Sequence, residues 1–371
     1  MSEIGENMLL VRETDFGLGM LRHAPLNESA VVSPLSVFFT LVMLQAGAKG
    51  ITKMQINELI AKGASDESIT DYYSTLSSKI LNATDGVKTR IANGFFLDKQ
   101  FNVQKEYVER IVEKYHSQVE ALDFSKLQET AEVINGFVNK STEGKIRDLV
   151  NADTVKGDAV SFVANAIYFT ADWLQKFYRS SNSKELFYSA ENVSREVEFM
   201  NDFQVHRQYA EDDEVEVLSL PYQDDSYAFN IILPKKRFGF GSVRSKLDGP
   251  RIQKLLSGLE ETCVSITIPK MKIETNFDLK QALMNMGITE IFSDNADLSG
   301  IVNKAPLKVS DATHKAIIEV DEEGTTAAAA TLFKIVPVMA ISDEPKNFVA
   351  NHPFMFILTK DKNPLFMGQF V

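Results

Sequence analysis

The sequence predicts an α+β fold in a single domain over residues 1–371. Val37 to Ala46 is almost wholly apolar, and a helix that is apolar on every side lies inside a large protein. Ser161 to Phe169 is a continuous apolar strand, which is the pattern of the middle of a sheet. Length alone would suggest two domains, but no linker rich in glycine, serine or proline divides the chain.

The other predicted elements of the N-terminal half follow in order. Asn7 to His23 has the apolar spacing of an amphipathic helix, and Ala30 to Val32 is a short strand. Lys62 to Leu81 is polar and is predicted to be helical in its later part. Ile91 to Leu97 is a predicted strand, and a helix should follow from about Gln104 to His116.

In the C-terminal half, most of the predicted elements are strands. The runs Leu218–Tyr222 and Tyr227–Pro234 predict a hairpin. Val264 to Ile268 alternates as a half-buried strand does, and Asp278 to Met286 predicts a helix. Val309 to Val320 then leads directly into a run of small residues.

Composition limits the classes of function. The hydrophobic content of 44% is ample for a large core, and the net charge of −12 disfavours binding to nucleic acid or heparin-like polyanions. Cys263 is the only cysteine, so no internal disulfide can form. No apolar run reaches the roughly 18 residues of a membrane span. The acidic start, Met1 to Glu6, lacks the pattern of a signal peptide, so we expect a cytoplasmic protein, with extracellular export left open.

The chain carries no recognisable pattern of catalytic residues. It has no Gly-x-Ser-x-Gly elbow, no His-Glu-x-x-His, no paired-cysteine metal spacing and no phosphate-binding glycine loop. Its five histidines are scattered, and none has the helical spacing of metal ligands. We therefore expect that the protein is not an enzyme and binds no metal or cofactor.

The stretch Glu322-Glu-Gly-Thr-Thr-Ala-Ala-Ala-Ala-Thr331 has mixed preferences. Its four alanines are the best helix formers, but a glycine and two threonines precede them and a β-branched run follows. With a period of two, one face carries only small uncharged side chains: Thr325, Ala327, Ala329 and Thr331. Such a face can enter a packed sheet as a strand. Ile335 to Met339, which contains Pro337, predicts an extended apolar segment.

Several independent motifs along the chain are similar to those of the serpins. They are Ser33-Pro34-Leu35-Ser36 before the apolar helix, Asn165-Ala-Ile-Tyr-Phe169 followed by Trp173, Asn351-His-Pro-Phe354, Pro364-Leu-Phe-Met-Gly368 and the run from Glu322. The resemblance covers nearly the whole chain in the family's order and is to the intracellular type without a signal peptide. It implies three β-sheets surrounded by eight to nine helices, with an exposed reactive-centre loop at about residues 322–345.

The resemblance also assigns residues to four sites. The hinge of the loop is expected at Glu322, Gly324, Thr325, Ala327, Ala328, Ala329, Ala330 and Thr331. The reactive bond is expected between Val338 and Met339, or between Met339 and Ala340. A polar cluster beneath the main sheet, the shutter, is expected from Ser33, Ser36, Asn165 and His314, although each could instead be satisfied separately in the core. At the upper end of that sheet, the breach, Glu322 is expected to pair with Lys270 near Trp173, although both charges could instead be solvated.

The resemblance implies an inhibitor that a protease attacks as a substrate. The protease would form an acyl-enzyme on the cut loop, which would insert into a metastable sheet and trap the protease before deacylation. Val338 or Met339 offers a medium-sized apolar side chain, which favours chymotrypsin-like or elastase-like serine proteases as targets. Two alternatives stay open: a non-inhibitory serpin-fold protein that binds or chaperones a partner, and an inhibitor of papain-like cysteine proteases.

The hinge itself favours the inhibitory alternative, because no proline interrupts Gly324 to Val336. Thr326 stands where the family often has a glutamate, but it lies on the outward face of the expected strand. Lys79 is nearly alone where glycosaminoglycan-binding members have basic residues, so we do not expect activation by heparin. We expect a monomer, with neither nucleic acid nor membrane as a partner.

Overall fold

A computed structural model describes residues 3–83, 86–155, 159–303, 306–325 and 344–371. In these ranges the chain forms nine α-helices: α1 Glu3–Leu21, α2 Pro34–Gln45, α3 Gly50–Ala61, α4 Asp66–Leu81, α5 Lys105–Tyr115, α6 Leu127–Ser141, α7 Phe240–Lys246, α8 Gly249–Ser257 and α9 Leu279–Asn285. Two short 3₁₀ helices span Arg179–Ser181 and Glu290–Phe292. Among the same residues, no helix is both long enough and apolar enough to cross a membrane.

The described residues also form fifteen strands: β1 Ala30–Val32, β2 Val87–Asp98, β3 Gln118–Leu122, β4 Ser161–Asp172, β5 Ser183–Ala190, β6 Val193–Glu211, β7 Val215–Pro221, β8 Tyr227–Pro234, β9 Glu260–Pro269, β10 Met271–Asp278, β11 Asp311–Val320, β12 Gly324–Thr325, β13 Lys346–Val349, β14 Phe354–Lys360 and β15 Asn363–Phe370. The antiparallel hairpin expected from the runs at 218–222 and 227–234 is present as β7 and β8. Helices and strands together confirm the α+β fold class.

A six-stranded sheet forms the centre of the molecule, with the strand order β10-β11-β12-β4-β2-β3. In its middle, β4 pairs antiparallel with β2 on one side and parallel with β11 on the other. The residues from Ser161 to Phe169 are all buried, because α6 covers one face of this sheet while α2 and strands of the other sheet cover the opposite face. The prediction of a central strand at this position is therefore confirmed.

The remaining strands form one nine-stranded sheet. Its order is β1-β15-β14-β8-β7-β6-β9-β13, and β5 pairs with β6 beside this path. The three expected sheets thus form two hydrogen-bonded networks. The reason is β6, a strand of 19 residues that pairs first with β5, then with β9 and finally with β7, so that it joins what would otherwise be two separate sheets.

The agreement between the predicted and the observed helices is uneven. α2 begins three residues before the expected Val37, because the Ser33 side chain accepts a hydrogen bond from the Ser36 N–H and Pro34 fits the first turn. α3, α6, α7 and α8 were not predicted as helices. In α3, Ile56 and Ile60 are buried while the two apolar residues nearer its start, Ile51 and Met54, are exposed. Its apolar residues therefore do not mark a single face.

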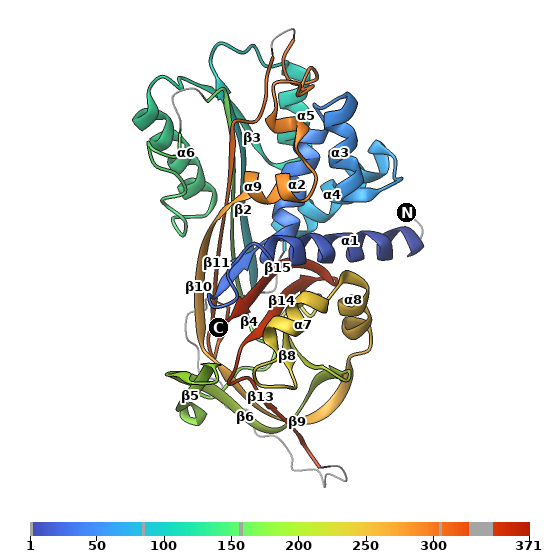
Figure 1. The fold of residues 1–371 in the computed structure, drawn as a ribbon, viewed down its shortest axis with the longest axis vertical. Helices are drawn as coiled ribbons and strands as arrows, with labels where there is room; N and C mark the ends of the chain where they lie inside the picture. Colours follow the sequence, from blue (N-terminus) through green and yellow to red (C-terminus); the bar gives the residue numbers. More distant parts are fainter. Residues whose placement is uncertain (1–2, 84–85, 156–158, 304–305, 326–343) are drawn as a thin grey trace.

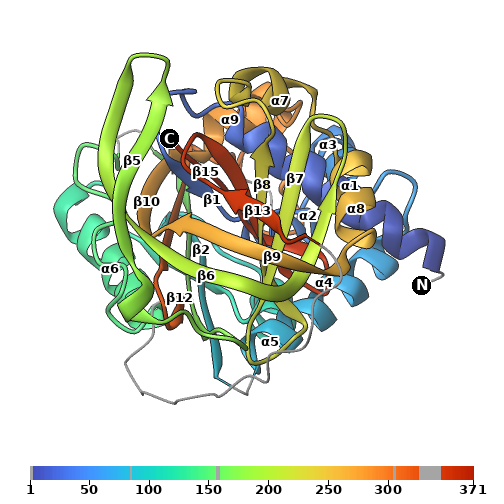
Figure 2. The same ribbon diagram turned by 90° about the horizontal axis from the view of Figure 1, so that it is seen from below.

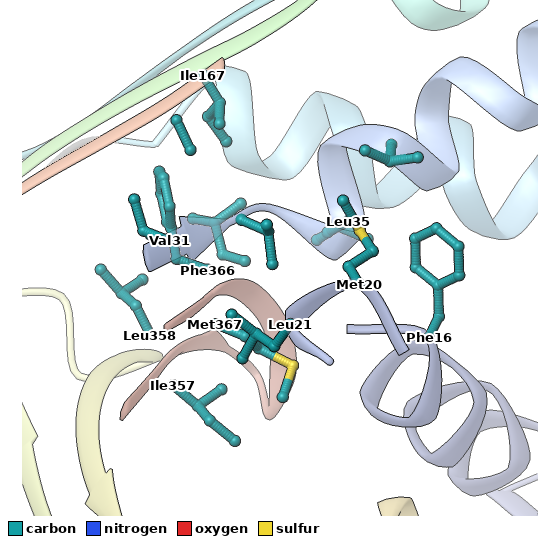
Figure 3. Close-up of a cluster of buried hydrophobic side chains, with 14 of the residues drawn as sticks. Phe16, Met20, Leu21, Val31, Leu35, Ile167, Ile357, Leu358, Phe366 and Met367 are labelled. Carbon is teal, nitrogen blue, oxygen red and sulfur yellow. The ribbon is translucent and has the colours of Figure 1, made fainter. Parts of the chain in front are cut away.

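Two hydrophobic cores lie on opposite faces of the six-stranded sheet. Figure 1 shows α6 on one side of β2 and β4, and α2 on the other. The smaller core, between α6 and the sheet, includes Phe96, Phe124 and Ile134. The larger core is on the α2 side, where residues of α1, β1, β14 and β15 meet β4 (Figure 3). The chain thus packs this sheet on both sides.

Candidate functional site

The two central strands of the six-stranded sheet separate at one end. β4 and β11 pair in parallel from Phe162 opposite Asp311 to Tyr168 opposite Ile317. Beyond Tyr168, β12 lies between them, with Thr325 opposite Ala171 of β4 and Val320 of β11. We call this point the fork. The sheet therefore already holds Gly324 and Thr325 as a short strand between its central strands.

This placement differs from the expectation of an exposed loop at about residues 322–345. Glu322 is 2% exposed and Thr325 is completely buried. The difference arises because the backbone of β12 finds hydrogen-bonding partners in the sheet, and buried backbone groups are stable only when they are paired. The N-terminal end of the expected loop is therefore part of the sheet.

Gly324 fits the fork because it has no side chain. A Cβ atom at this position would overlap the backbone oxygen of Ala171. The residue also has a φ of +155°, a conformation that residues with a Cβ rarely adopt. A glycine is thus required at the first residue of β12.

Thr325 has a specific partner inside the protein. Its Oγ1 lies 2.7 Å from the hydroxyl oxygen of Tyr222. The Tyr222 ring stacks on Trp173, with 4.5 Å between the ring centroids and 12° between the planes. Burial raises the pKa of Tyr222 far above its usual range, so this hydroxyl remains protonated. The buried hydroxyl pair therefore links β12 to the region around Trp173.

The Glu322 carboxylate is held by polar groups from three other segments. Lys270 Nζ lies 3.1 Å from its Oε1, Asn182 Nδ2 donates to the same oxygen at 2.5 Å, and Arg179 Nε lies 4.0 Å from Oε2. Burial alone would raise the pKa of Glu322, but the hydrogen bonds from Asn182 and Lys270 hold it below its usual value. The charges expected at the breach therefore form an ion pair in which the carboxylate is nearly buried and the lysine is partly exposed.

Trp173 fixes the backbone on either side of this carboxylate. Its Nε1 donates to the backbone oxygen of Asp321 at 2.8 Å, and its N–H donates to the backbone oxygen of Glu323 at 2.9 Å. The Glu323 carboxylate lies 2.8 Å from Nζ of Lys176. The structure thus brings the three expected breach residues Trp173, Lys270 and Glu322 together immediately before β12.

The four expected shutter residues form one hydrogen-bonded cluster. Ser36 Oγ donates to Asn165 Oδ1 at 2.8 Å, and His314 Nδ1 donates to the same oxygen. The Ser33 N–H donates to His314 Nε2 at 2.9 Å. The Ser33 Oγ donates to the backbone oxygen of Leu365 at 2.5 Å. The cluster therefore joins the start of α2 to β4, β11 and β15.

His314 is held as a neutral ring. Its Nε2 accepts the Ser33 N–H, so the ring proton is on Nδ1, where it is donated to Asn165. A second proton on Nε2 would face a donor instead of an acceptor. Burial lowers the pKa of His314 to about 3, in agreement with this arrangement.

The shutter lies on the closed part of the seam between β4 and β11. Asn165 and His314 are direct partners in the parallel pairing, three pairs away from the last pair before the fork. On the opposite face of the sheet, Lys315 Nζ donates to the backbone oxygen of Asp148, just after α6, at 3.0 Å. Separation of the two strands would therefore break the contact of His314 with Asn165, whereas Lys315 ties β11 to the segment after α6.

Sequence reasoning missed several residues of these clusters. Thr40 and Asn93 belong to the shutter, since Asn165 Nδ2 lies 3.0 Å from Thr40 Oγ1 and 2.5 Å from Asn93 Oδ1. The sequence could have indicated both as buried polar residues, because they lie inside apolar stretches. No sequence pattern marks Tyr222, Asn182 or Lys176, because only the folded chain brings them to the hinge.

The remaining candidate residues lie outside the described ranges. These are the hinge residues Ala327, Ala328, Ala329, Ala330 and Thr331 and the reactive-bond residues Val338, Met339 and Ala340. In the part of the chain that the structure describes, no group of three or more His, Cys, Asp or Glu residues is placed to hold a metal ion.

Comparison with known proteins gives a consistent result. The family described as "Serpin (serine protease inhibitor)" matches residues 12–371. Serpin B4 from Homo sapiens is 32% identical over 359 residues, covering 91% of this chain and 92% of that protein. The structure of Serpin48, a highly specific serpin of the insect Tenebrio molitor, is similar with a TM-score of 0.89 and 29% identity, covering 100% of this chain and 98% of that one. Human thyroxine-binding globulin, solved in complex with thyroxine, is similar with a TM-score of 0.86 and 25% identity over 97% of each chain.

Proposed function

Because this chain belongs to the serpin family, we propose that it is an inhibitory serpin that traps chymotrypsin-like or elastase-like serine proteases. The protease would cut Val338–Met339 or Met339–Ala340 and stay attached to the loop as an acyl-enzyme. The loop would then insert between β4 and β11 of the six-stranded sheet. We further propose that the chain acts as a cytoplasmic monomer and catalyses no reaction of its own.

The position of β12 is the observation that carries this proposal. Its two residues already lie between β4 and β11, so the sheet accepts a strand at this position. A strand that continued from Thr325 would place Ala327, Ala329 and Thr331 on the same face as Thr325. These side chains are small, and a packed sheet admits small side chains with the least rearrangement.

Insertion explains how cutting a loop could disable a protease. Residues 325–338 would form a strand of about 46 Å, at about 3.3 Å per residue. A protease attached at its end would be carried over that distance, and the pull would distort its catalytic site before the acyl bond is hydrolysed. Before the cut, the loop is tied at both ends and this movement is blocked.

Incubation with chymotrypsin and with pancreatic elastase, followed by denaturing gel electrophoresis, tests the proposal. The expected result is a band at the summed mass of inhibitor and protease that survives boiling. A fragment that begins at residue 339 or 340 should be released, and its mass decides between the two bonds. Cleavage of the loop without a covalent band would contradict the proposal.

A second candidate function is non-covalent binding of a partner without inhibition. It is supported by the similarity to thyroxine-binding globulin, whose structure contains thyroxine. The same gel separates the two functions, because a binding protein would be cut like any substrate. A papain-like cysteine protease in a third reaction tests whether a thiol protease is trapped as well.

A further inference from the structure

A buried carboxyl group on α1 has no hydrogen-bonding partner. Glu13 is completely buried, and both of its carboxyl oxygens lack a hydrogen-bond partner among the residues that the structure describes. The next two residues of α1 are paired with α8. Thr14 Oγ1 accepts a hydrogen bond from Gln253 Nε2 at 2.9 Å, and Asp15 accepts one from the Gly249 N–H at 2.6 Å. Buried polar groups are nearly always paired, so the exception at Glu13 requires an explanation.

An aromatic residue of α4 lies beside this carboxyl group. The Tyr73 hydroxyl is close enough to lower the pKa of Glu13, but within the described ranges it has no partner in hydrogen-bonding geometry either. The Tyr73 ring stacks on Phe38 of α2, with 5.6 Å between the ring centroids. Phe38 also contacts Phe16, one turn beyond Glu13 on α1, with 4.8 Å between the centroids. Rings from α1, α2 and α4 therefore form an apolar cluster at this site.

In the described parts of the chain, no charged group faces Glu13 from its own helix or from the elements packed around it. On α1, the positions that share its face are Leu9, Leu10, Phe16 and Gly17. α2, β1 and β15, which pack against α1, have no charged residue.

α3, α4 and α8 do carry charged residues, and Figure 2 shows these helices with α1 on one side of the molecule. Each of these charges is exposed or paired elsewhere, and none contributes to the pKa of Glu13. The paired ones are Lys53 with Asp66, Glu58 with Lys62, and Arg251 with Asp212, and the exposed ones are Glu67, Asp71, Lys79 and Lys254.

These surroundings keep Glu13 uncharged at neutral pH. An ionised carboxylate in this position would be buried without a cation, which is far costlier than burial of the neutral acid. Burial raises the pKa of Glu13 to about 8, against an ordinary value of 4.5, and the opposing effect of the Tyr73 hydroxyl is smaller. Loss of the proton would therefore force the carboxylate to reach water.

We propose that Glu13 forms a pH-sensitive contact between α1 and α4, which is stable while the carboxyl group is protonated and opens when the proton is lost. Because Glu13 is completely buried, its carboxylate can reach water only if α1 and α4 move apart locally. The inference is separate from the proposed function, because it concerns the folded chain without a protease.

This contact should make the folded chain less stable as the pH rises. Between pH 4.5 and about 8, the folded chain keeps a proton on Glu13 that the unfolded chain has lost. The stabilising effect is therefore complete below about pH 4.5 and is lost as the pH rises to about 8. The unfolding equilibrium constant should rise by up to about tenfold per pH unit in that interval. His314 acts in the opposite direction below pH 6.5, so the effect of Glu13 is measured against a variant.

The test compares urea unfolding of the wild-type chain and of Glu13→Gln, which has a similar shape and cannot ionise. The ratio of the wild-type unfolding constant to that of Glu13→Gln should rise about 50-fold to 100-fold from pH 5 to pH 7 and level off above about pH 8. Glu13→Leu, which removes the polar group, should give the same dependence of the ratio on pH. Glu113→Gln, at an exposed position on α5, is the control and should give a constant ratio.

Two further measurements locate the proton and the opening. The infrared spectrum of the wild-type chain at neutral pH should contain the carbonyl band of a protonated carboxylic acid, which Glu13→Gln should lack. This band should disappear from the wild-type spectrum as the pH rises past about 8. At pH 9, the α4 amides should exchange hydrogen about threefold or more faster in the wild type than in Glu13→Gln. The amides of α6, on the opposite face of the six-stranded sheet, should exchange equally in both (Figure 1).

The outcomes separate the two parts of the inference. A ratio for Glu13→Gln that stays constant between pH 5 and pH 8 would overturn it, and so would an equal change in Glu113→Gln. Absence of the acid band from the wild-type spectrum at neutral pH would also overturn it, whether or not the variants fold. Equal exchange of the α4 amides in the wild type and in Glu13→Gln at pH 9 would show that α1 and α4 do not separate.

Discussion

The hydroxyl groups of Tyr222 and Thr325 lie 2.7 Å apart at the fork, where β12 separates β4 from β11. Both side chains are completely buried, so neither hydroxyl could form a hydrogen bond with water if the other hydroxyl were removed. Trp173 is the only tryptophan in the chain and stacks on the Tyr222 ring. Its fluorescence therefore reports on the region where β12 is held.

Tyr222→Phe should weaken the attachment of β12, because it leaves the Thr325 hydroxyl buried without a partner. The expected loss of stability is about 1–2 kcal/mol. Thr325→Val should cost a similar amount, and the double variant should lose about 1 kcal/mol less than the sum of the two. The urea midpoint of the Trp173 fluorescence change measures all three. Strictly additive losses would show that the two hydroxyls do not interact.

Thr325→Arg should convert the proposed inhibitor into a substrate. The fork buries position 325 completely, and an unpaired charge there would cost several kcal/mol. Thr326→Arg is the control, because the alternation of a strand puts position 326 on the outward face. On a denaturing gel, Thr325→Arg should yield cleaved chain without a covalent band, whereas Thr326→Arg should still trap protease. Trapping by Thr325→Arg at the wild-type stoichiometry would rule out insertion at this residue.

Gly324→Ala should destabilise the fork, because the added Cβ would overlap the backbone of Ala171. Forced overlap of this kind costs about 1–3 kcal/mol. Gly136→Ala offers the matched control: a Cβ at that position in α6 meets no atom within 4 Å. The same added methyl group should stabilise α6 by up to about 1 kcal/mol. Equal urea midpoints for the two variants would contradict this account of β12.

Acid should destabilise the protein through His314. Burial lowers its pKa to about 3, against an ordinary value of 6.5 that applies to the unfolded chain. Between these two values the unfolded chain binds a proton that the folded chain does not. The stabilising effect is therefore complete above about pH 6.5 and is lost as the pH falls toward 3. The free energy of unfolding should fall by up to about 1.4 kcal/mol per pH unit in that interval.

His314→Gln tests this assignment. The variant should be less stable at pH 7, because it disturbs the contacts to Ser33 and Asn165, and its stability should depend less on pH below 6.5. Some dependence should remain, since burial also lowers the pKa of His352. His23→Gln, at an exposed position, provides the control. An unchanged pH dependence in His314→Gln would show that another group is responsible.

Most of the fold could be read from local patterns in the sequence. β1 has its predicted bounds, and β8 was placed to the residue, because short apolar runs between turns identify strands. β3 was missed because it is a partly exposed edge strand of five residues with little apolar patterning. The joining of two expected sheets through β6 could not be predicted, since it depends on pairing between segments far apart in the chain.

The candidate site was predicted less completely than the fold. The structure places Ser33, Ser36, Asn165 and His314 in one cluster, where sequence reasoning had expected them from family resemblance. The contact of Tyr222 with Thr325 spans 103 residues and leaves no local pattern. The buried position of β12 was also not foreseen, because the sequence shows that a strand can enter the sheet but not how far it has entered.

The fork also determines how many backbone hydrogen bonds the sheet can form. Where β4 meets β11 there is one ladder, whereas Thr325 of β12 takes part in two, one to either neighbour. Further advance of this strand would add the residues after Thr325 in the same register, so the alternation of side chains between the two faces would be kept. Seven residue pairs still join β4 directly to β11, and a strand inserted there could form backbone hydrogen bonds with both of them. The folded chain stops short of its largest possible sheet.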